Sequence, residues 1–121
     1  MKRASTLSVI GAGVASLAQQ RVAEEVGREI ARRGAVLVCG GRGGVMEAAA
    51  CGARLEGGHT VGILAGYDRA QANQYIEFAI ASGMGEARNV IVVASGDAVI
   101  ALEGEAGTLS EIGLAMKLAS Q

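Results

Sequence analysis

The chain has 121 residues, a formal net charge of −1 and 19 glycines, and it contains no proline or tryptophan. Half of the residues are hydrophobic and 19% are charged, which excludes a disordered chain and predicts one domain over residues 1–121. The near-neutral charge and the few aromatic residues argue against nucleic acid as a partner. No run of 18 apolar residues occurs, so we expect a cytoplasmic protein without a membrane span.

Short apolar runs alternate with helical patterns along the whole chain. The pattern predicts strands over 7–10, 35–39, 60–64, 75–79 and 98–102, and helices over 17–33, 45–56, 86–94 and 108–119. The predicted strands are apolar on both faces, which is typical of a parallel sheet covered on two sides. We therefore predict an α/β fold with a doubly wound parallel sheet between helices.

The first candidate site follows the first predicted strand. Gly11, Gly13 and Ser16 have the spacing of the GxGxxG phosphate loop, except that the third glycine is Ser16. A tight strand-to-helix turn explains the same pattern. The second predicted strand ends in Cys39 and Gly40 instead of the acidic residue that binds a ribose hydroxyl, which disfavours an ordinary dinucleotide fold.

The second candidate site is the glycine loop 40–44, between the second predicted strand and its helix. Gly40, Gly41, Gly43 and Gly44 would let a phosphate reach the backbone amides at the helix N-terminus, and Arg42 could add a charged hydrogen bond. The alternative is a turn whose glycines are needed for close packing of helix and sheet. We favour the phosphate site, because packing alone seldom needs four glycines in five residues.

Two charged residues at predicted helix starts carry competing interpretations. Glu111 lies three residues after Thr108, so it is either a capping-box residue or a catalytic carboxylate. Arg88 lies at a helix N-terminus, where a cation is locally unfavourable, so it is either a ligand-binding residue or simply exposed. Cys39 is expected to be a buried small hydrophobe and His59 a surface loop residue. With two cysteines and one histidine in the chain, we expect no metal site.

Three motifs together resemble one known family. GGRGGVM at 40–46 resembles the GGxxG(V/L)M signature of the Lonely Guy (LOG)-like family, whose members were first described as lysine decarboxylases. ARN at 87–89 resembles the arginine motif of that family, and GEAGTLSE at 104–111 resembles its PGGxGTxxE motif. The resemblance runs in order through nearly the whole chain. The ARN and GTLSE forms are most similar to the molybdenum-cofactor-carrier-like branch.

The resemblance implies a Rossmann-like, three-layer α/β/α fold that binds a small phosphorylated ligand, either a nucleotide or the molybdenum cofactor, a phosphorylated pterin. The enzyme branch hydrolyses the N-glycosidic bond of nucleoside 5′-monophosphates to free base and ribose 5-phosphate. Its catalytic arginine and glutamate correspond to Arg88 and Glu111. The residues expected to bind the ligand are the glycines and neighbours of all three loops: Gly11, Gly13, Gly40, Gly41, Arg42, Gly43, Gly44, Gly104, Gly107 and Thr108.

Departures from the family pattern favour binding over hydrolysis. Glu103 and Glu105 replace a proline and a glycine of PGGxGT, and a carboxylate there repels an anionic ligand. We therefore expect a binding protein, with a phosphoribohydrolase and an oligomeric scaffold with a degenerate pocket as alternatives. The family usually has another strand after its last helix, whereas the sequence given stops at Gln121, so we expect either a truncated piece of a longer chain or a shortened member with five strands. Its members are dimers or higher oligomers, which implies a homo-oligomer built on helices of the second or fourth βα unit.

Overall fold

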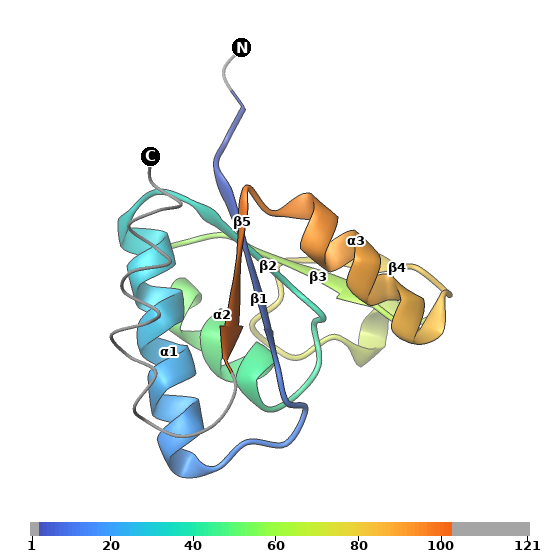
Figure 1. Ribbon diagram of the computed structural model, residues 1–121, viewed down its shortest axis with the longest axis horizontal. Helices are drawn as coiled ribbons and strands as arrows, with labels where there is room; N and C mark the ends of the chain where they lie inside the picture. The colour runs from blue at the N-terminus through green and yellow to red at the C-terminus, as the bar shows by residue number, and fades with distance from the viewer. Residues whose placement is uncertain (1–2, 103–121) are drawn as a thin grey trace.

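In the computed structural model, which describes residues 3–102, five strands form one parallel sheet in the order β4-β3-β2-β1-β5 (Figure 1). The strands are β1 (Thr6–Gly11), β2 (Val36–Cys39), β3 (Thr60–Leu64), β4 (Phe78–Ala81) and β5 (Ala98–Leu102). The α-helices are α1 (Leu17–Arg32), α2 (Val45–Leu55) and α3 (Arg88–Ser95), and two short 3-10 turns are η1 (Arg69–Gln71) and η2 (Gly85–Ala87). The predicted parallel α/β fold is confirmed.

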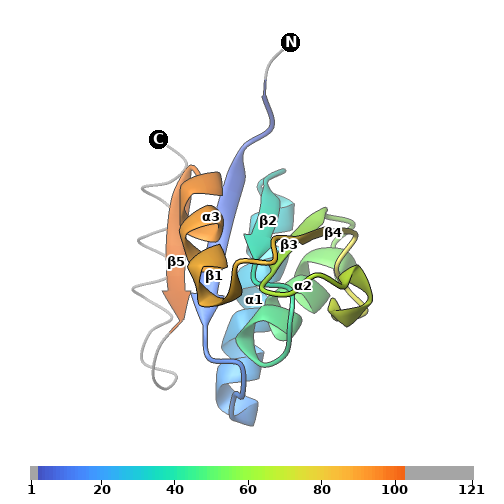
Figure 2. The same cartoon turned by 90° about the vertical axis from the view of Figure 1, so that its right-hand side faces the viewer.

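The helices cover the sheet from both sides. Helices α1 and α2 lie on one face and α3 lies on the other, which gives three layers (Figure 2). The larger core lies between the sheet and the α1–α2 layer, and a smaller one, around Val38, Ile63 and Val92, lies beneath α3. The sheet runs from β1 out to β4 on one side and continues with β5 on the other. Neighbouring connections therefore diverge at the β1–β5 boundary, where doubly wound folds form ligand crevices.

Local interactions define both ends of α1. The Ser16 hydroxyl accepts a hydrogen bond from the Gln19 amide, and the Gln19 side chain accepts one from the Ser16 amide, so the capping box is complete. After the helix, Gly34 has a φ of +73°, a conformation that glycine adopts without strain. These two signals fix where α1 begins and ends.

The predicted fourth strand was placed three residues too early. The apolar pattern indicated 75–79, whereas β4 is Phe78–Ala81. The residues before it are held in a turn, because the Thr60 hydroxyl donates to the Tyr75 carbonyl at 2.6 Å and accepts from the Glu77 amide at 2.8 Å. These side-chain bonds replace a strand ladder over that stretch.

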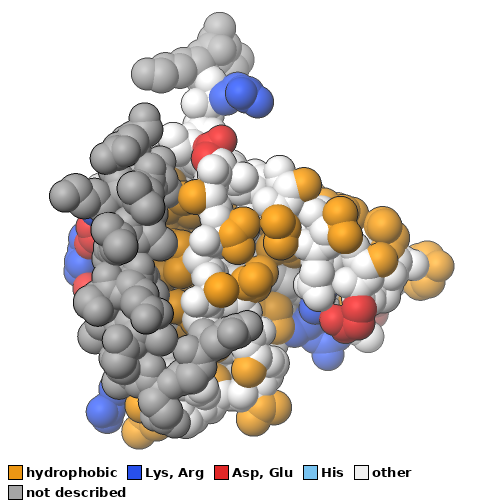
Figure 3. Space-filling model, in the orientation of Figure 1, with side chains coloured by type: hydrophobic (Ala, Val, Ile, Leu, Met, Phe, Trp, Pro, Cys, Tyr) orange, Lys and Arg blue, Asp and Glu red, His pale blue; other side chains and the backbone are white. Residues whose placement is uncertain are grey.

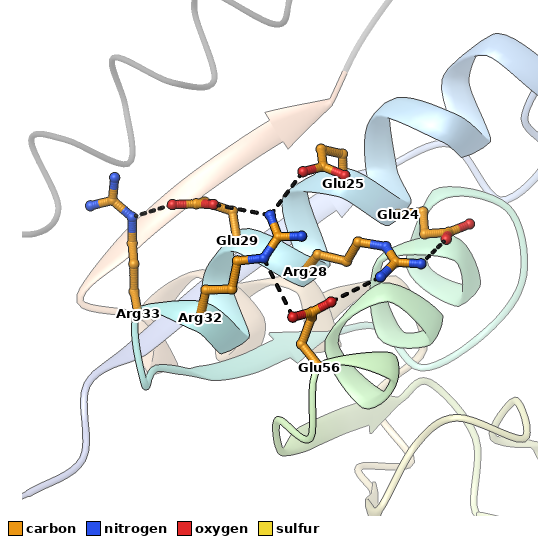
Figure 4. Close-up of polar contacts among 7 residues, drawn as sticks. All are labelled: Glu24, Glu25, Arg28, Glu29, Arg32, Arg33 and Glu56. Carbon is orange, nitrogen blue, oxygen red and sulfur yellow. Dashed lines mark hydrogen bonds and ion pairs between the residues drawn. The ribbon is translucent and has the colours of Figure 1, made fainter.

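Helices α1 and α2 pack unusually closely through two glycines. A Cβ atom on Gly27 would overlap the Ala49 carbonyl oxygen, and one on Gly52 would overlap the Glu24 carbonyl oxygen. Ion pairs join the exposed sides of the same two helices, as Figure 4 shows, with Glu56 of the α2 C-terminus accepting from Arg28 at 2.9 Å and from Arg32 at 3.4 Å. The glycines therefore set the distance between the two helices, and the ion pairs lie at the edge of the helix–helix contact.

Candidate ligand-binding cleft

A cleft of about 350 Å³ opens at the carboxyl ends of β1 and β2, beside the N-terminus of α3. It brings together four of the predicted site residues: Gly11, Gly13, Gly40 and Arg88. Its other lining residues are Val9, Ile10, Met46, Glu86, Asn89 and Val93. The place agrees with the rule that open α/β sheets bind ligands outside the carboxyl ends of their strands, near the point where the connections diverge.

Arg88 is buried, with 7% of its surface exposed, so its interpretation as an exposed residue is wrong. Its side chain reaches the ends of two strands, where Nη1 donates to the Gly40 carbonyl at 2.7 Å and to the Ile63 carbonyl at 2.9 Å. Nε donates to the Asn89 side-chain oxygen at 3.0 Å. Nη2 has no hydrogen-bond partner among residues 3–102. The guanidinium thus holds the strand ends together and lines the cleft with one donor group to spare.

Three glycines of the loop 40–44 are required by packing or by backbone conformation. A Cβ on Gly40 would lie 2.6 Å from the Met46 sulfur and 2.9 Å from the Arg88 guanidinium carbon. Gly41 and Gly44 have φ values of +77° and +64°. A Cβ on Gly44 would also overlap the backbone of the first loop. For these three positions the packing interpretation of the loop is sufficient.

Gly13 and Gly43 differ from those three. Neither has a positive φ, and a Cβ on Gly13 would meet nothing within 4 Å. A Cβ on Gly43 would meet one atom, the Gly13 carbonyl oxygen at 3.3 Å. The two loops are tied together by the Val45 amide, which donates to the Ala12 carbonyl at 3.0 Å. Packing therefore does not demand a glycine at position 13, which lines the cleft, whereas a side chain on the neighbouring Gly43 would press on the Gly13 carbonyl.

Arg42 is directed away from this cleft. Its side chain is exposed and Nη1 donates to the Gln71 side-chain oxygen at 3.0 Å, on η1. Its carbonyl accepts from the Asn73 side chain at 2.7 Å. The expected ligand contact from Arg42 is therefore not part of the described cleft lining. Instead, Arg42 anchors the connection between β3 and β4.

Glu86 and Asn89 line the cleft but were not proposed as site residues from the sequence. The Asn89 amide nitrogen donates to the Glu86 carboxylate at 3.3 Å, while the Asn89 oxygen accepts from Arg88. Their spacing in the sequence was a signal, because Glu86 and Asn89 are three residues apart at a predicted helix start and such residues lie on one face of a helix. The surrounding polar sequence gave no reason to prefer that face over the solvent-exposed one.

Cys39 is a buried residue, as predicted. Burial raises the pKa of its thiol to about 11, so the thiol stays protonated. Within the described part of the chain, no group of three histidine, cysteine or acidic side chains could hold a metal ion. No helix there is long and apolar enough to cross a membrane.

The third predicted loop lies outside the described residues. Its expected ligand-binding residues Gly104, Gly107 and Thr108, together with the candidate catalytic residue Glu111, fall within 103–121. The same holds for the predicted last helix. The cleft as described is lined by residues of β1, the first two loops, α2, η2 and α3.

Comparisons with known proteins agree with this geometry. The chain is 48% identical over 111 residues to an uncharacterised protein of Archaeoglobus fulgidus, a match that covers 92% of this chain and 73% of the other. The molybdenum cofactor binding protein of the phototrophic bacterium Rippkaea orientalis superposes with a TM-score of 0.83 and 41% identity, over 98% of this chain and 74% of that one.

The molybdenum cofactor (Moco) carrier protein of Chlamydomonas reinhardtii is a second similar structure. Its TM-score is 0.76 at 34% identity, and the match covers 98% of this chain and 74% of the carrier. These neighbours confirm the Rossmann-like fold and the resemblance to the LOG-like, molybdenum-cofactor-carrier-like branch. A model of the SLOG cluster4 family matches residues 4–121, and the chain belongs to that family.

Proposed function

We propose that this protein binds a small phosphorylated ligand of the molybdenum-cofactor type and holds it without changing it chemically. The observation that carries the proposal is Gly13, which lines the cleft although packing does not require a glycine there, and which has Gly43 of the second loop beside it. A glycine leaves room for a phosphate to reach the backbone amides, which a side chain would block. Phosphate binding therefore explains a glycine that packing does not require. The similar proteins of Rippkaea and Chlamydomonas are a cofactor-binding and a cofactor-carrier protein, which supports the same ligand class.

The cleft has the parts that such a ligand requires. Its volume of about 350 Å³ falls within the usual range for small-molecule sites. The spare Nη2 group of Arg88 supplies a charged donor, which gives stronger hydrogen bonds to phosphate than a neutral donor. Met46 and Val93 add apolar surface for a flat ring. We propose that the phosphate lies toward the two loops and the ring toward α3.

A nucleoside 5′-monophosphate phosphoribohydrolase remains the second candidate, because Arg88 lines the cleft as the catalytic arginine of such enzymes would. However, its Nε and Nη1 atoms are already bonded to Asn89 and to two backbone carbonyls. This arrangement suits a residue that holds a site open and positions an anion. The proposed partner of Arg88 in hydrolysis, Glu111, lies outside the described residues.

Titration calorimetry with molybdenum cofactor, AMP, GMP and inorganic phosphate tests the proposal. Each nucleotide is also incubated with the protein and assayed for free base by chromatography. We expect saturable binding of the cofactor or of a nucleotide, with no base released above the level of a protein-free control. Release of free base, lost in Glu111→Gln, would replace the binding proposal with the hydrolase. Absence of binding by every ligand would overturn both.

We also propose that the protein forms a homo-oligomer through the face that carries α3. On this face Val90 is 70% exposed and Phe78 is 55% exposed. The strand register puts Phe78 and Ile80 beside Val61 and Ile63, which form the core under α3, so the apolar surface continues from β4 to the helix. Figure 3 shows apolar side chains gathered on this face. Sedimentation velocity should give a dimer or larger species for the wild type and a monomer for Val90→Glu; a wild-type monomer at all concentrations would contradict this.

A further inference from the structure

Glu86 adds a carboxylate to the lining of the cleft. Among the described lining residues the only charged side chains are Arg88 and Glu86. Glu86 makes no ion pair within residues 3–102, and its one hydrogen bond there is the 3.3 Å contact from the Asn89 amide to Oε2. Its second oxygen, Oε1, has no partner in this part of the structure. The described cleft lining therefore includes a free donor, Arg88 Nη2, and a free acceptor, Glu86 Oε1.

Asn89 fixes the position of this carboxylate relative to the rest of the site. Its side-chain oxygen accepts from Arg88 Nε at 3.0 Å, which leaves its amide nitrogen as the donor to Glu86. Arg88 is itself bonded to the carbonyls of Gly40 and Ile63. A chain of hydrogen bonds thus runs from the carboxyl ends of β2 and β3 to Glu86. The carboxylate is held at the cleft although the residue is exposed.

An ionised carboxylate only accepts hydrogen bonds, and it can accept two in parallel. A flat ring with two adjacent N–H donors on one edge matches this geometry. Guanine and pterin share such an edge, because both contain a 2-amino-4-oxopyrimidine ring, whose ring N–H and 2-amino group are the two donors; we call it the 2-amino-4-oxo edge. Adenine pairs a donor with a ring acceptor on the corresponding edge, so it would face the carboxylate with one lone pair. We propose that Glu86 selects ligands that carry a 2-amino-4-oxo edge, with their anionic group at the glycine loops. This inference rests on the proposed function and narrows its ligand class.

Binding of four probes tests the selection: GMP, inosine 5′-monophosphate (IMP), AMP and pterin-6-carboxylate, which is fluorescent. GMP has both donors, the ring N–H and the 2-amino group. IMP has only the ring N–H, and AMP has neither, because its ring nitrogen at that position is an acceptor. We expect GMP to bind about tenfold more tightly than AMP, the ratio expected of one good bidentate pair, with IMP between them. Pterin-6-carboxylate should compete with GMP, which separates recognition of the edge from recognition of ribose phosphate.

The variant Glu86→Gln should lower the affinity for GMP and the pterin to that of AMP while leaving AMP binding unchanged. The matched control is Glu25→Gln, a carboxylate on the exposed side of α1 that lies outside the cleft and should leave all affinities unchanged. Equal affinities of GMP and AMP in the wild type, or an equal loss of both in Glu86→Gln, would overturn the selection by Glu86 and leave the proposed function standing. Failure of all four probes to bind while molybdenum cofactor binds would also overturn the selection, and failure of molybdenum cofactor as well would overturn the proposed function itself.

Discussion

Glycine has a different role in two regions of this molecule. Where α1 crosses α2, Gly27 and Gly52 are fully explained by packing, because any side chain would overlap the backbone of the facing helix. At the cleft, Gly13 and Gly43 face open space or a single atom, and their backbone conformations suit any residue. The comparison shows that glycine content alone does not locate a ligand site. A ligand site is indicated by glycines that neither packing nor backbone conformation requires.

The largest expected effect comes from adding one methyl group at the helix crossing. Gly52→Ala favours helix formation locally, yet it forces α1 and α2 apart because its Cβ overlaps the Glu24 carbonyl. We expect the free energy of unfolding to fall by about 3 kcal/mol, the upper part of the range for overpacked cores. Urea denaturation measures this. Gly66→Ala is the control, since its Cβ would make ordinary contact with Gln71 at 3.4 Å. Unchanged stability in Gly52→Ala would show that the helices are not in close contact.

Arg88 holds two strand ends together and also lines the cleft, so replacing it should affect both stability and binding. Arg88→Leu leaves the carbonyls of Gly40 and Ile63 without their donor, and we expect a loss of about 2 kcal/mol in the free energy of unfolding. Phosphate-ligand affinity should fall as well. Arg88→Lys keeps the charge but cannot reproduce all three hydrogen bonds, so it should restore only part of the stability. If Arg88→Leu were as stable as the wild type, these bonds would not hold the strand ends.

Replacing a glycine at the cleft should lower ligand affinity and leave stability unchanged, unlike Gly52→Ala at the helix crossing. Gly13→Ala should leave the free energy of unfolding within about 0.5 kcal/mol of the wild type, because its Cβ meets nothing within 4 Å. Its affinity for a phosphorylated ligand should fall about tenfold, since the methyl group occupies the approach to the backbone. Gly43→Val should abolish binding. Calorimetric titration alongside urea denaturation separates the two effects. Full affinity in both variants would reduce these glycines to loop residues without function.

The smallest expected effect is at the edge of the α1–α2 crossing. Glu56→Gln removes the carboxylate shared by Arg28 and Arg32, whose raised pKa values reflect hydrogen bonds first with Glu24 and Glu25, respectively. The side chains are partly exposed, so the stability loss should be much smaller than in Gly52→Ala and should disappear in 1 M salt. Thermal unfolding at low and high salt measures it. A loss that persists at high salt would mean that Glu56 contributes through packing.

The sequence predicted the strand and helix order well, because the apolar patterns are local. It placed β4 three residues early, since the hydroxyl of Thr60 that holds residues 75–77 in a turn comes from a distant position in the chain. Of the residues that it proposed for the site, Gly11, Gly13, Gly40 and Arg88 line the described cleft. It could not show that Arg42 turns toward Gln71 or that Glu86 lines the cleft, because side-chain direction depends on the packed loops.

Following backbone amides during a ligand titration tests directly whether the glycine loops at the cleft bind the ligand. Nitrogen–proton correlation spectra of the labelled wild-type protein resolve glycine amides in a separate region, so Gly13, Gly43, Gly27 and Gly52 can be followed together. With molybdenum cofactor or GMP as the ligand, we expect saturable shifts at Gly13 and Gly43 and none at Gly27 and Gly52. Saturable binding that leaves the amides of Gly13 and Gly43 unmoved would place the ligand elsewhere and contradict the central claim.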